Sequence, residues 1–265
     1  MMRATHAAVG LVSMLTLCGA IGCGQPEKPY EKKPDPKEKA EVPPVPNLPP
    51  LQRKNGDAWT VHGLIHDFRS MNHHAEVDGA KLSIAGYITR TNLVPCADPK
   101  TMDGKKEQCV PVCAVHDGGL RKGKKNPGDP EGCKAPIPSF WIGDTADAKE
   151  VIQVIGFAST FAQLHDAILI IDDTKPEKRT EKEFLESIVD TQFATQMPNP
   201  IPAKGAKVKV SGTYGAQALK GSGTAIDPNH GILTYENIEY IEEAPELAIL
   251  PGMKERKKDE PPKKK

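Results

Sequence analysis

The sequence lacks net charge. Its 35 Lys and Arg residues balance 35 Asp and Glu residues, so the formal charge at pH 7 is zero. A nucleic-acid-binding domain normally carries a basic face, whereas the surplus lysines here lie in the C-terminal tail and around Arg121–Lys125. We therefore expect no nucleic-acid partner.

Recognisable catalytic motifs are also missing. No serine stands in a GxSxG elbow, and no HExxH pair of a zinc protease occurs. Residues Gly118–Lys124 fit the spacing GxxxxGK, but Lys125 replaces the Ser or Thr that would hold Mg²⁺. The residues therefore indicate no enzyme class, and we expect no cofactor.

Long apolar runs are rare, and the N-terminal one is typical of a secretory signal. Arg3 precedes an uncharged, mostly apolar stretch from Ala7 to Gly22, which is too short for a comfortable membrane span. Small residues at Ala20 and Gly22 suit signal-peptidase cleavage. The sequence therefore predicts an exported protein with a signal peptide over residues 1–22.

The residue after this segment is a cysteine. Ala20-Ile21-Gly22-Cys23 resembles the lipobox of bacterial lipoproteins, in which the thiol receives a diacylglyceryl group. The resemblance implies lipidation of Cys23 and a membrane anchor, while plain cleavage would leave Cys23 free. Gly24 and Gln25 contain no Asp of the kind associated with inner-membrane retention, which favours the outer membrane, with the domain facing the periplasm or the cell surface.

Both ends of the mature chain have little to bury. Residues 23–57 are dominated by Pro, Lys and Glu, which predicts a disordered tether. At ~3.1 Å per residue, an extended chain of that length reaches on the order of 100 Å. Residues 246–265 form a basic tail that we also expect to be disordered, which leaves one folded domain over residues 58–245.

Alternation of apolar and polar residues predicts several strands in this domain. The expected strands are Lys81–Asn92, Ser139–Gly143, Val151–Phe157, Ala206–Tyr214 and Gly231–Ile241, with a weaker one at Thr60–Phe68.

Helical spacing appears between the third and fourth of these strong strands. Phe161, Leu164 and Ile168 share one helix face, although the β-branched stretch Ile168–Ile171 also suits a strand. A capping-box pattern at Thr180 predicts a second helix over Glu181–Thr195.

The order of three strands, a helical connection and two strands is that of an OB-fold. The segments FWIGD, VKVSGTYG and GILTYENIEYI resemble strands of exported OB-like domains. The resemblance implies a mainly β (α+β) domain with one or two helices, built as an OB-fold-like five-stranded barrel.

Four cysteines lie in a long loop insertion over residues 95–138, namely Cys96, Cys109, Cys113 and Cys133. An even number in an exported chain predicts two disulfides, with three possible connectivities. A Cys109–Cys113 bridge would close too short a loop to stabilise much, so we expect the main bridge to involve Cys96 or Cys133, and these two to lie close together. We also expect the insertion to need covalent closure, since its apolar content is low.

Two alternatives involve metal ions. Cys109, Cys113 and His116 have the atoms to hold copper or zinc, or to act in thiol redox chemistry. His62, His66, His73 and His74 lie in one short stretch, and if Thr60–Phe68 is a strand, His62 and His66 share a face and could hold a divalent metal at the surface. Solvated histidines on a polar face are the favoured interpretation of this stretch.

The sequence therefore predicts a membrane-anchored envelope lipoprotein whose OB-like domain is a binding or interaction module for an envelope protein or a small molecule. The alternative is an envelope metal-handling or thiol-redox protein that uses Cys109, Cys113 and His116.

Overall fold

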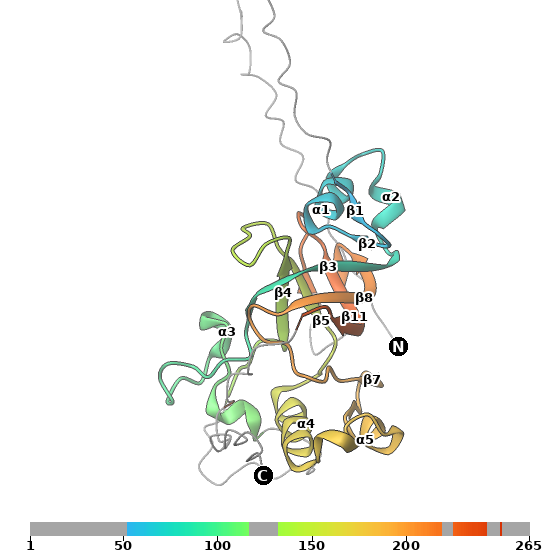
Figure 1. Cartoon of the computed structure of the whole chain (residues 1–265). Helices are drawn as coiled ribbons and strands as arrows, with labels where there is room; N and C mark the ends of the chain where they lie inside the picture. The colour runs from blue at the N-terminus through green and yellow to red at the C-terminus, as the bar shows by residue number, and fades with distance from the viewer. Residues whose placement is uncertain (1–51, 117–131, 219–224, 243–249, 251–265) are drawn as a thin grey trace, which may run out of the picture. The chain divides into compact units, whose positions relative to one another are not determined.

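The computed structural model describes residues 52–116, 132–218, 225–242 and 250 (Figure 1). The expected signal peptide, Cys23, most of the tether and all of the basic tail except Leu250 lie outside the described residues. Among the helices that are described, none combines the length and the apolar character needed to cross a bilayer.

The described residues are mainly β with several short helices. The strands are β1 Lys54–Asn55, β2 Ala58–Trp59, β3 Lys81–Thr91, β4 Ser139–Gly143, β5 Ile152–Ile155, β6 Val189–Asp190, β7 Thr195–Gln196, β8 Lys207–Gly215, β9 Gln217–Ala218, β10 Ala225–Ile226 and β11 Ile232–Tyr240. The helices are α1 Val61–Arg69, α2 His74–Val77, α3 Gly104–Glu107, α4 Phe161–Asp173 and α5 Lys182–Ser187, with 3₁₀ turns η1 Val112–Val115 and η2 Pro176–Lys178.

The described strands form one mixed seven-stranded sheet and two small hairpins. β3 is antiparallel to both β4 and β8, and Figure 1 shows β3 alongside β8. β4 continues antiparallel to β5, β5 runs parallel to β11, and β11 is antiparallel to β8. Following the pairings from β3 through β4, β5, β11 and β8 therefore leads back to β3. The α+β class expected from the sequence is confirmed.

The core follows the alternation in the strands. Four branched side chains are completely buried, namely Ile84 and Ile88 of β3 and Val208 and Val210 of β8. The residues between them are partly exposed, except Gly86, which is buried. Burying each such side chain contributes roughly 1.5–3 kcal/mol relative to leaving it exposed. Gly86 lies between the two isoleucines because a Cβ there would lie 2.5 Å from the Gly143 carbonyl oxygen.

The expected strand at Thr60–Phe68 is wrong, because this segment is helix α1. The Thr60 hydroxyl accepts a hydrogen bond from the Gly63 amide and caps the helix. Val61 and Leu64 lie on the buried face together with Ile65 and Phe68, at the spacing of a helix and not of a strand.

The expected helix over Glu181–Thr195 is confirmed only in its first part. Helix α5 ends at Ser187, and β6 and β7 form a hairpin after it. The cause is Asp190, which is completely buried and whose carboxylate accepts hydrogen bonds from the amides of Gln192 and Phe193. These bonds fold the chain into a turn that competes with the helix.

The ambiguous stretch Ile168–Ile171 is helical. Helix α4 runs without interruption to Asp173, and the Thr160 hydroxyl caps its start by accepting from the Gln163 amide. Ile168 and Ile171 are buried against the core, so tertiary packing outweighs the β preference of branched side chains.

The insertion contains two disulfides, Cys96–Cys109 and Cys113–Cys133. Each bridge includes one of the two outer cysteines, and no bridge joins Cys109 to Cys113. Burial also contributes to the order of the insertion, because five of its residues belong to the main hydrophobic core or pack against it, namely Val110, Ala114, Val115, Cys133 and Ala135. That the insertion needs covalent closure stays a prediction.

Candidate binding site on helix α1

Helix α1 presents two histidines on its exposed face. The side chains of His62 and His66 are 56% and 55% exposed, one turn apart on the helix. Residues four apart on a helix lie on the same face with Cβ atoms roughly 5–6 Å apart. The sequence expectation that these two share a face is confirmed, although the reason is the helical period and not a strand.

A cavity of about 310 Å³ lies along this face. We call it the histidine cavity, and its lining is His62, Ile65, His66, Arg69, Ser70 and Glu150. All of these except Glu150 come from α1 or the residue that caps its C-terminus. A second cavity of about 510 Å³ shares His62 and extends over Tyr87 of β3 and Lys207 of β8.

The connection between β4 and β5 holds the start of α1 in place. The Asp144 carboxylate accepts hydrogen bonds from the amides of Val61 at 2.7 Å and His62 at 2.8 Å. These amides have no partner within the helix, so the carboxylate satisfies two donors and also interacts with the helix dipole. The same connection places Glu150 beside His62.

Each histidine has its Nδ1 atom next to a carboxylate. His62 Nδ1 lies 2.6 Å from Glu150 Oε2, and His66 Nδ1 lies 3.3 Å from Asp67 Oδ1. An ionised carboxylate only accepts hydrogen bonds, so Nδ1 carries the proton in both rings. In the neutral imidazole this leaves the lone pair on Nε2.

The charges around the cavity are largely compensated. Hydrogen bonding from His62 holds the pKa of Glu150 below its usual value, burial opposes this shift, and the positive fields of His62, Arg69 and His230 add to it. Arg69 Nη1 lies 3.7 Å from Glu150, and its Nε donates to the Asn229 carbonyl at 2.9 Å. The buried Asp67 carboxylate pairs with Arg53.

The other two histidines of this stretch do not line the histidine cavity. His73 Nδ1 lies 3.0 Å from Glu76, and His74 Nδ1 lies 2.5 Å from the Phe68 carbonyl oxygen. Sequence reasoning missed Arg69 and Glu150. The helical period of α1 would have revealed Arg69, whereas no local signal identifies Glu150, which is 88 residues from its partner His62.

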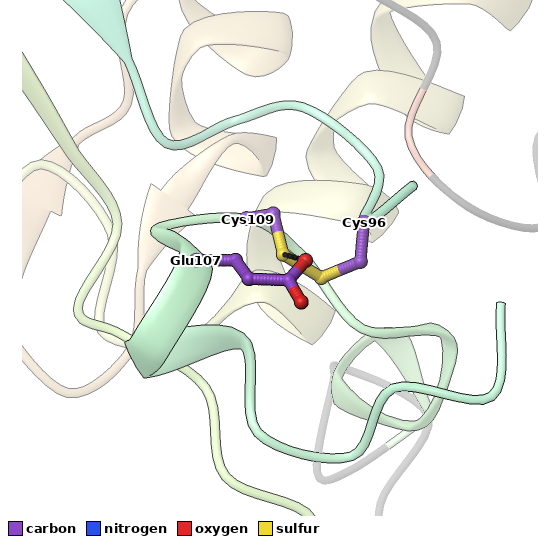
Figure 2. Close-up of side chains that lie close together, drawn as sticks. All are labelled: Cys96, Glu107 and Cys109. Carbon is purple, nitrogen blue, oxygen red and sulfur yellow. Dashed lines mark hydrogen bonds between the residues drawn. A yellow bond between two sulfur atoms is a disulfide. The ribbon is translucent and has the colours of Figure 1, made fainter. Parts of the chain in front are cut away.

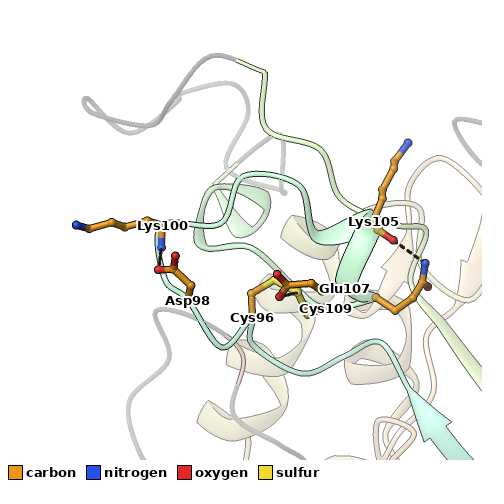
Figure 3. The surroundings of a disulfide bond; sticks show 7 residues. Cys96, Asp98, Lys100, Lys105, Glu107 and Cys109 are labelled. Carbon is orange, nitrogen blue, oxygen red and sulfur yellow. Dashed lines mark hydrogen bonds between the residues drawn. A yellow bond between two sulfur atoms is a disulfide. The ribbon is translucent and has the colours of Figure 1, made fainter.

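The cysteine cluster has a different chemistry. Cys96, Glu107 and Cys109 place their ligand-type atoms within 4.8 Å of one another, as Figure 2 shows. The two sulfurs are bonded to each other, however, so neither offers a thiolate to a metal in this oxidised form. Figure 3 shows charged side chains around the bridge, among them Asp98, whose carboxylate accepts from the Lys100 amide.

The alternative set of Cys109, Cys113 and His116 is divided by the disulfides. Cys109 is bonded to Cys96 and Cys113 to Cys133, so the two sulfurs belong to separate bridges. His116 follows η1, and its amide donates to the Cys113 carbonyl. Metal binding by both sulfurs of this set requires reduction of both bridges.

No family model, curated protein or solved structure matches the chain.

Proposed function

We propose that the protein is a lipid-anchored lipoprotein of the cell envelope whose folded part is an OB-like module that binds a protein or a small molecule. The observation that carries the module is the order of strand pairing. In chain order the five long strands β3, β4, β5, β8 and β11 pair as first–second–third–fifth–fourth–first, which is the order of the five-stranded Greek-key barrel. Helix α4 lies between the third and fourth strands.

Binding is the activity that the surface supports best. The two cavities at His62, of about 310 and 510 Å³, lie at the small end of the size range of ligand pockets. Their polar groups are two imidazoles, the Arg69 guanidinium, the Lys207 ammonium, carboxylates that already accept hydrogen bonds, and several hydroxyl and amide groups. This arrangement provides recognition contacts without an activated nucleophile and its base.

Export and anchoring rest on two further observations. Both cysteine pairs of the insertion are oxidised, which is typical of proteins outside the cytosol. Cys23 follows a signal-like segment and precedes a Pro-rich stretch. A lipid on Cys23 and an extended tether would hold the module away from the membrane, which we propose to be the outer membrane, with the module facing the periplasm or the cell surface.

Membrane fractionation tests this proposal. Cys23→Ser should move the protein from the membrane fraction to the soluble envelope fraction, while the matched variant Cys18→Ser should stay with the membranes. Mass spectrometry of the natural N-terminus should find an acylated Cys23. If both variants fractionate alike and the N-terminus carries no acyl mass, the proposal that the protein is a lipoprotein is contradicted.

The released Cys23→Ser protein also serves to identify a partner. Crosslinking in the envelope, followed by affinity capture of the full chain, should recover a partner. A substitution in either cavity, such as Lys207→Ala, should reduce the amount of this partner that is captured. Capture that is indifferent to substitutions in both cavities would place the binding surface elsewhere.

A further inference from the structure

We propose that His62 and His66 form a binding site for a divalent first-row transition-metal ion, coordinated by the Nε2 atoms of the two rings. The site depends on helix α1 and the β4–β5 connection, and it requires neither the lipid anchor nor a closed barrel. It therefore goes beyond the proposed function and is tested separately.

The first argument is spacing. His62 and His66 lie four residues apart on α1 and both line the histidine cavity. Two imidazoles at this spacing lie on one helix face, which is the arrangement that helical His-x-x-x-His zinc motifs use. Neighbouring His73 and His74 are adjacent in sequence and point in different directions, so they do not form an equivalent pair.

The second argument is the orientation of the rings. Glu150 and Asp67 each accept from the Nδ1 of one histidine, at 2.6 and 3.3 Å. Metal-binding histidines almost always donate their other ring N–H to a carboxylate, carbonyl or water, which fixes the tautomer and raises the basicity of the coordinating nitrogen. Both rings of the pair have this second partner.

The third argument is rigidity. The amides at the start of α1 are satisfied by Asp144 and Thr60, and the buried face of the helix packs in the core. The helix therefore exists before any ion arrives, and binding does not have to supply the free energy of ordering the backbone.

The fourth argument is charge. Two imidazoles beside the carboxylates of Glu150 and Asp67 suit a cation better than an anion, and Arg69 is directed to Glu150 and to the Asn229 carbonyl. Imidazole nitrogens favour Cu²⁺, Ni²⁺ and Zn²⁺ over Mg²⁺ and Ca²⁺, which prefer oxygen ligands. Two protein ligands leave the remaining coordination positions to water or to a donor from a bound partner.

Calorimetric titration of the full-length Cys23→Ser chain with Zn²⁺ or Cu²⁺ alone tests the proposal. His62→Gln and His66→Gln should each lower the affinity at least tenfold, and Glu150→Gln, which removes a carboxylate behind a ligand, should lower it roughly tenfold or more. The matched control His73→Gln should leave the affinity unchanged, and Mg²⁺ should not compete.

Protection from histidine modification gives a second readout on the unsubstituted chain. Zn²⁺ should slow the reaction of His62 and His66 with diethylpyrocarbonate, but not that of His73. Equal affinity in the His62→Gln/His66→Gln double variant, an equal loss in His73→Gln, or protection of the pair by inorganic phosphate and not by Zn²⁺ would overturn the site.

Discussion

Helix α1 and the Cys-containing insertion both carry residues that can bind metals, but they are held in different ways. In the insertion, Cys96, Cys109, Cys113 and Cys133 are used up in cross-links. In α1, the backbone is fixed by Asp144 and by core packing, so the imidazoles of His62 and His66 remain available. Where covalent bonds provide the order, the potential ligands are lost to structure, whereas a capped helix leaves them available for binding.

The largest expected effect is on the insertion. In the chain-entropy account, a bridge that closes a loop of 13 or 20 residues contributes about 3 kcal/mol to the free energy of unfolding. Replacing Cys113 and Cys133 by Ser should therefore lower the thermal midpoint clearly and increase protease cleavage within the insertion.

The control for this prediction is the Cys96→Ser/Cys109→Ser pair, which should cost a similar amount. A midpoint that does not change in either double variant would show that burial of Val110 and Val115 alone orders the insertion.

The next effect concerns how closely α1 packs. A Cβ on Gly63 would lie 2.5 Å from the Arg53 Cα atom, so Gly63→Ala should destabilise the domain by roughly 1–3 kcal/mol, as overpacking does. Chemical denaturation measures this effect. Ala75→Gly on α2 is the comparison variant, because it changes helix propensity without creating a clash. Gly79→Ala is unsuitable, because Gly79 has a positive φ and alanine would be strained there. Stabilisation by Gly63→Ala would contradict the packing described for α1.

A smaller effect should follow from loss of the cap. Asp144→Ala leaves the amides of Val61 and His62 without an acceptor and should cost roughly 0.5–2 kcal/mol. Asp147→Ala in the same connection removes an exposed carboxylate that accepts only from the Thr145 hydroxyl among the bonds described, and should cost little. Equal thermal midpoints for the two variants would show that the cap does not hold α1.

The smallest effect should be the pH dependence of Glu150. Its pKa is lowered in the folded state, mainly by the hydrogen bond from His62. The stabilisation is therefore complete above the unfolded value near 4.5 and is lost as the pH falls through the lower folded pKa.

Glu150→Gln should accordingly reduce stability at neutral pH by no more than roughly 1 kcal/mol, because the side chain is 43% exposed and its ion pairs are screened. Thermal midpoints of both proteins between pH 7 and acid conditions measure this difference. The difference in thermal midpoint between the two proteins should shrink as the pH falls. A difference that grows towards low pH would contradict the lowered pKa of Glu150.

Local patterns predicted the five main strands of the sheet, most clearly β3 and β8, which are eleven and nine residues long. Alternate residues of β3 and β8 are buried, so the period of two is visible in the sequence itself. Helix α1 was missed because it is only nine residues long and contains Gly63, a poor helix former. The glycine is explained by the nearby Arg53 backbone, a tertiary contact that no local pattern reveals.

The candidate site shows the same limit. The sequence identified His62 and His66 as a pair, because two histidines four apart are conspicuous in any regular structure. Glu150 and Asp144 reach α1 from the connection after β4, and only the folded sheet brings them there. The predicted helix was wrong beyond Ser187 for a related reason. Asp190 accepts hydrogen bonds from Ser159, which is 31 residues away in the sequence, so no local pattern reveals this contact.

The most direct test of the contrast between the two regions is non-reducing peptide mapping of protein taken from the cell envelope, with free thiols alkylated before lysis. The account predicts bridges Cys96–Cys109 and Cys113–Cys133 and no alkylation of these four residues. Four alkylated cysteines would contradict it and would favour metal or redox chemistry at Cys109, Cys113 and His116.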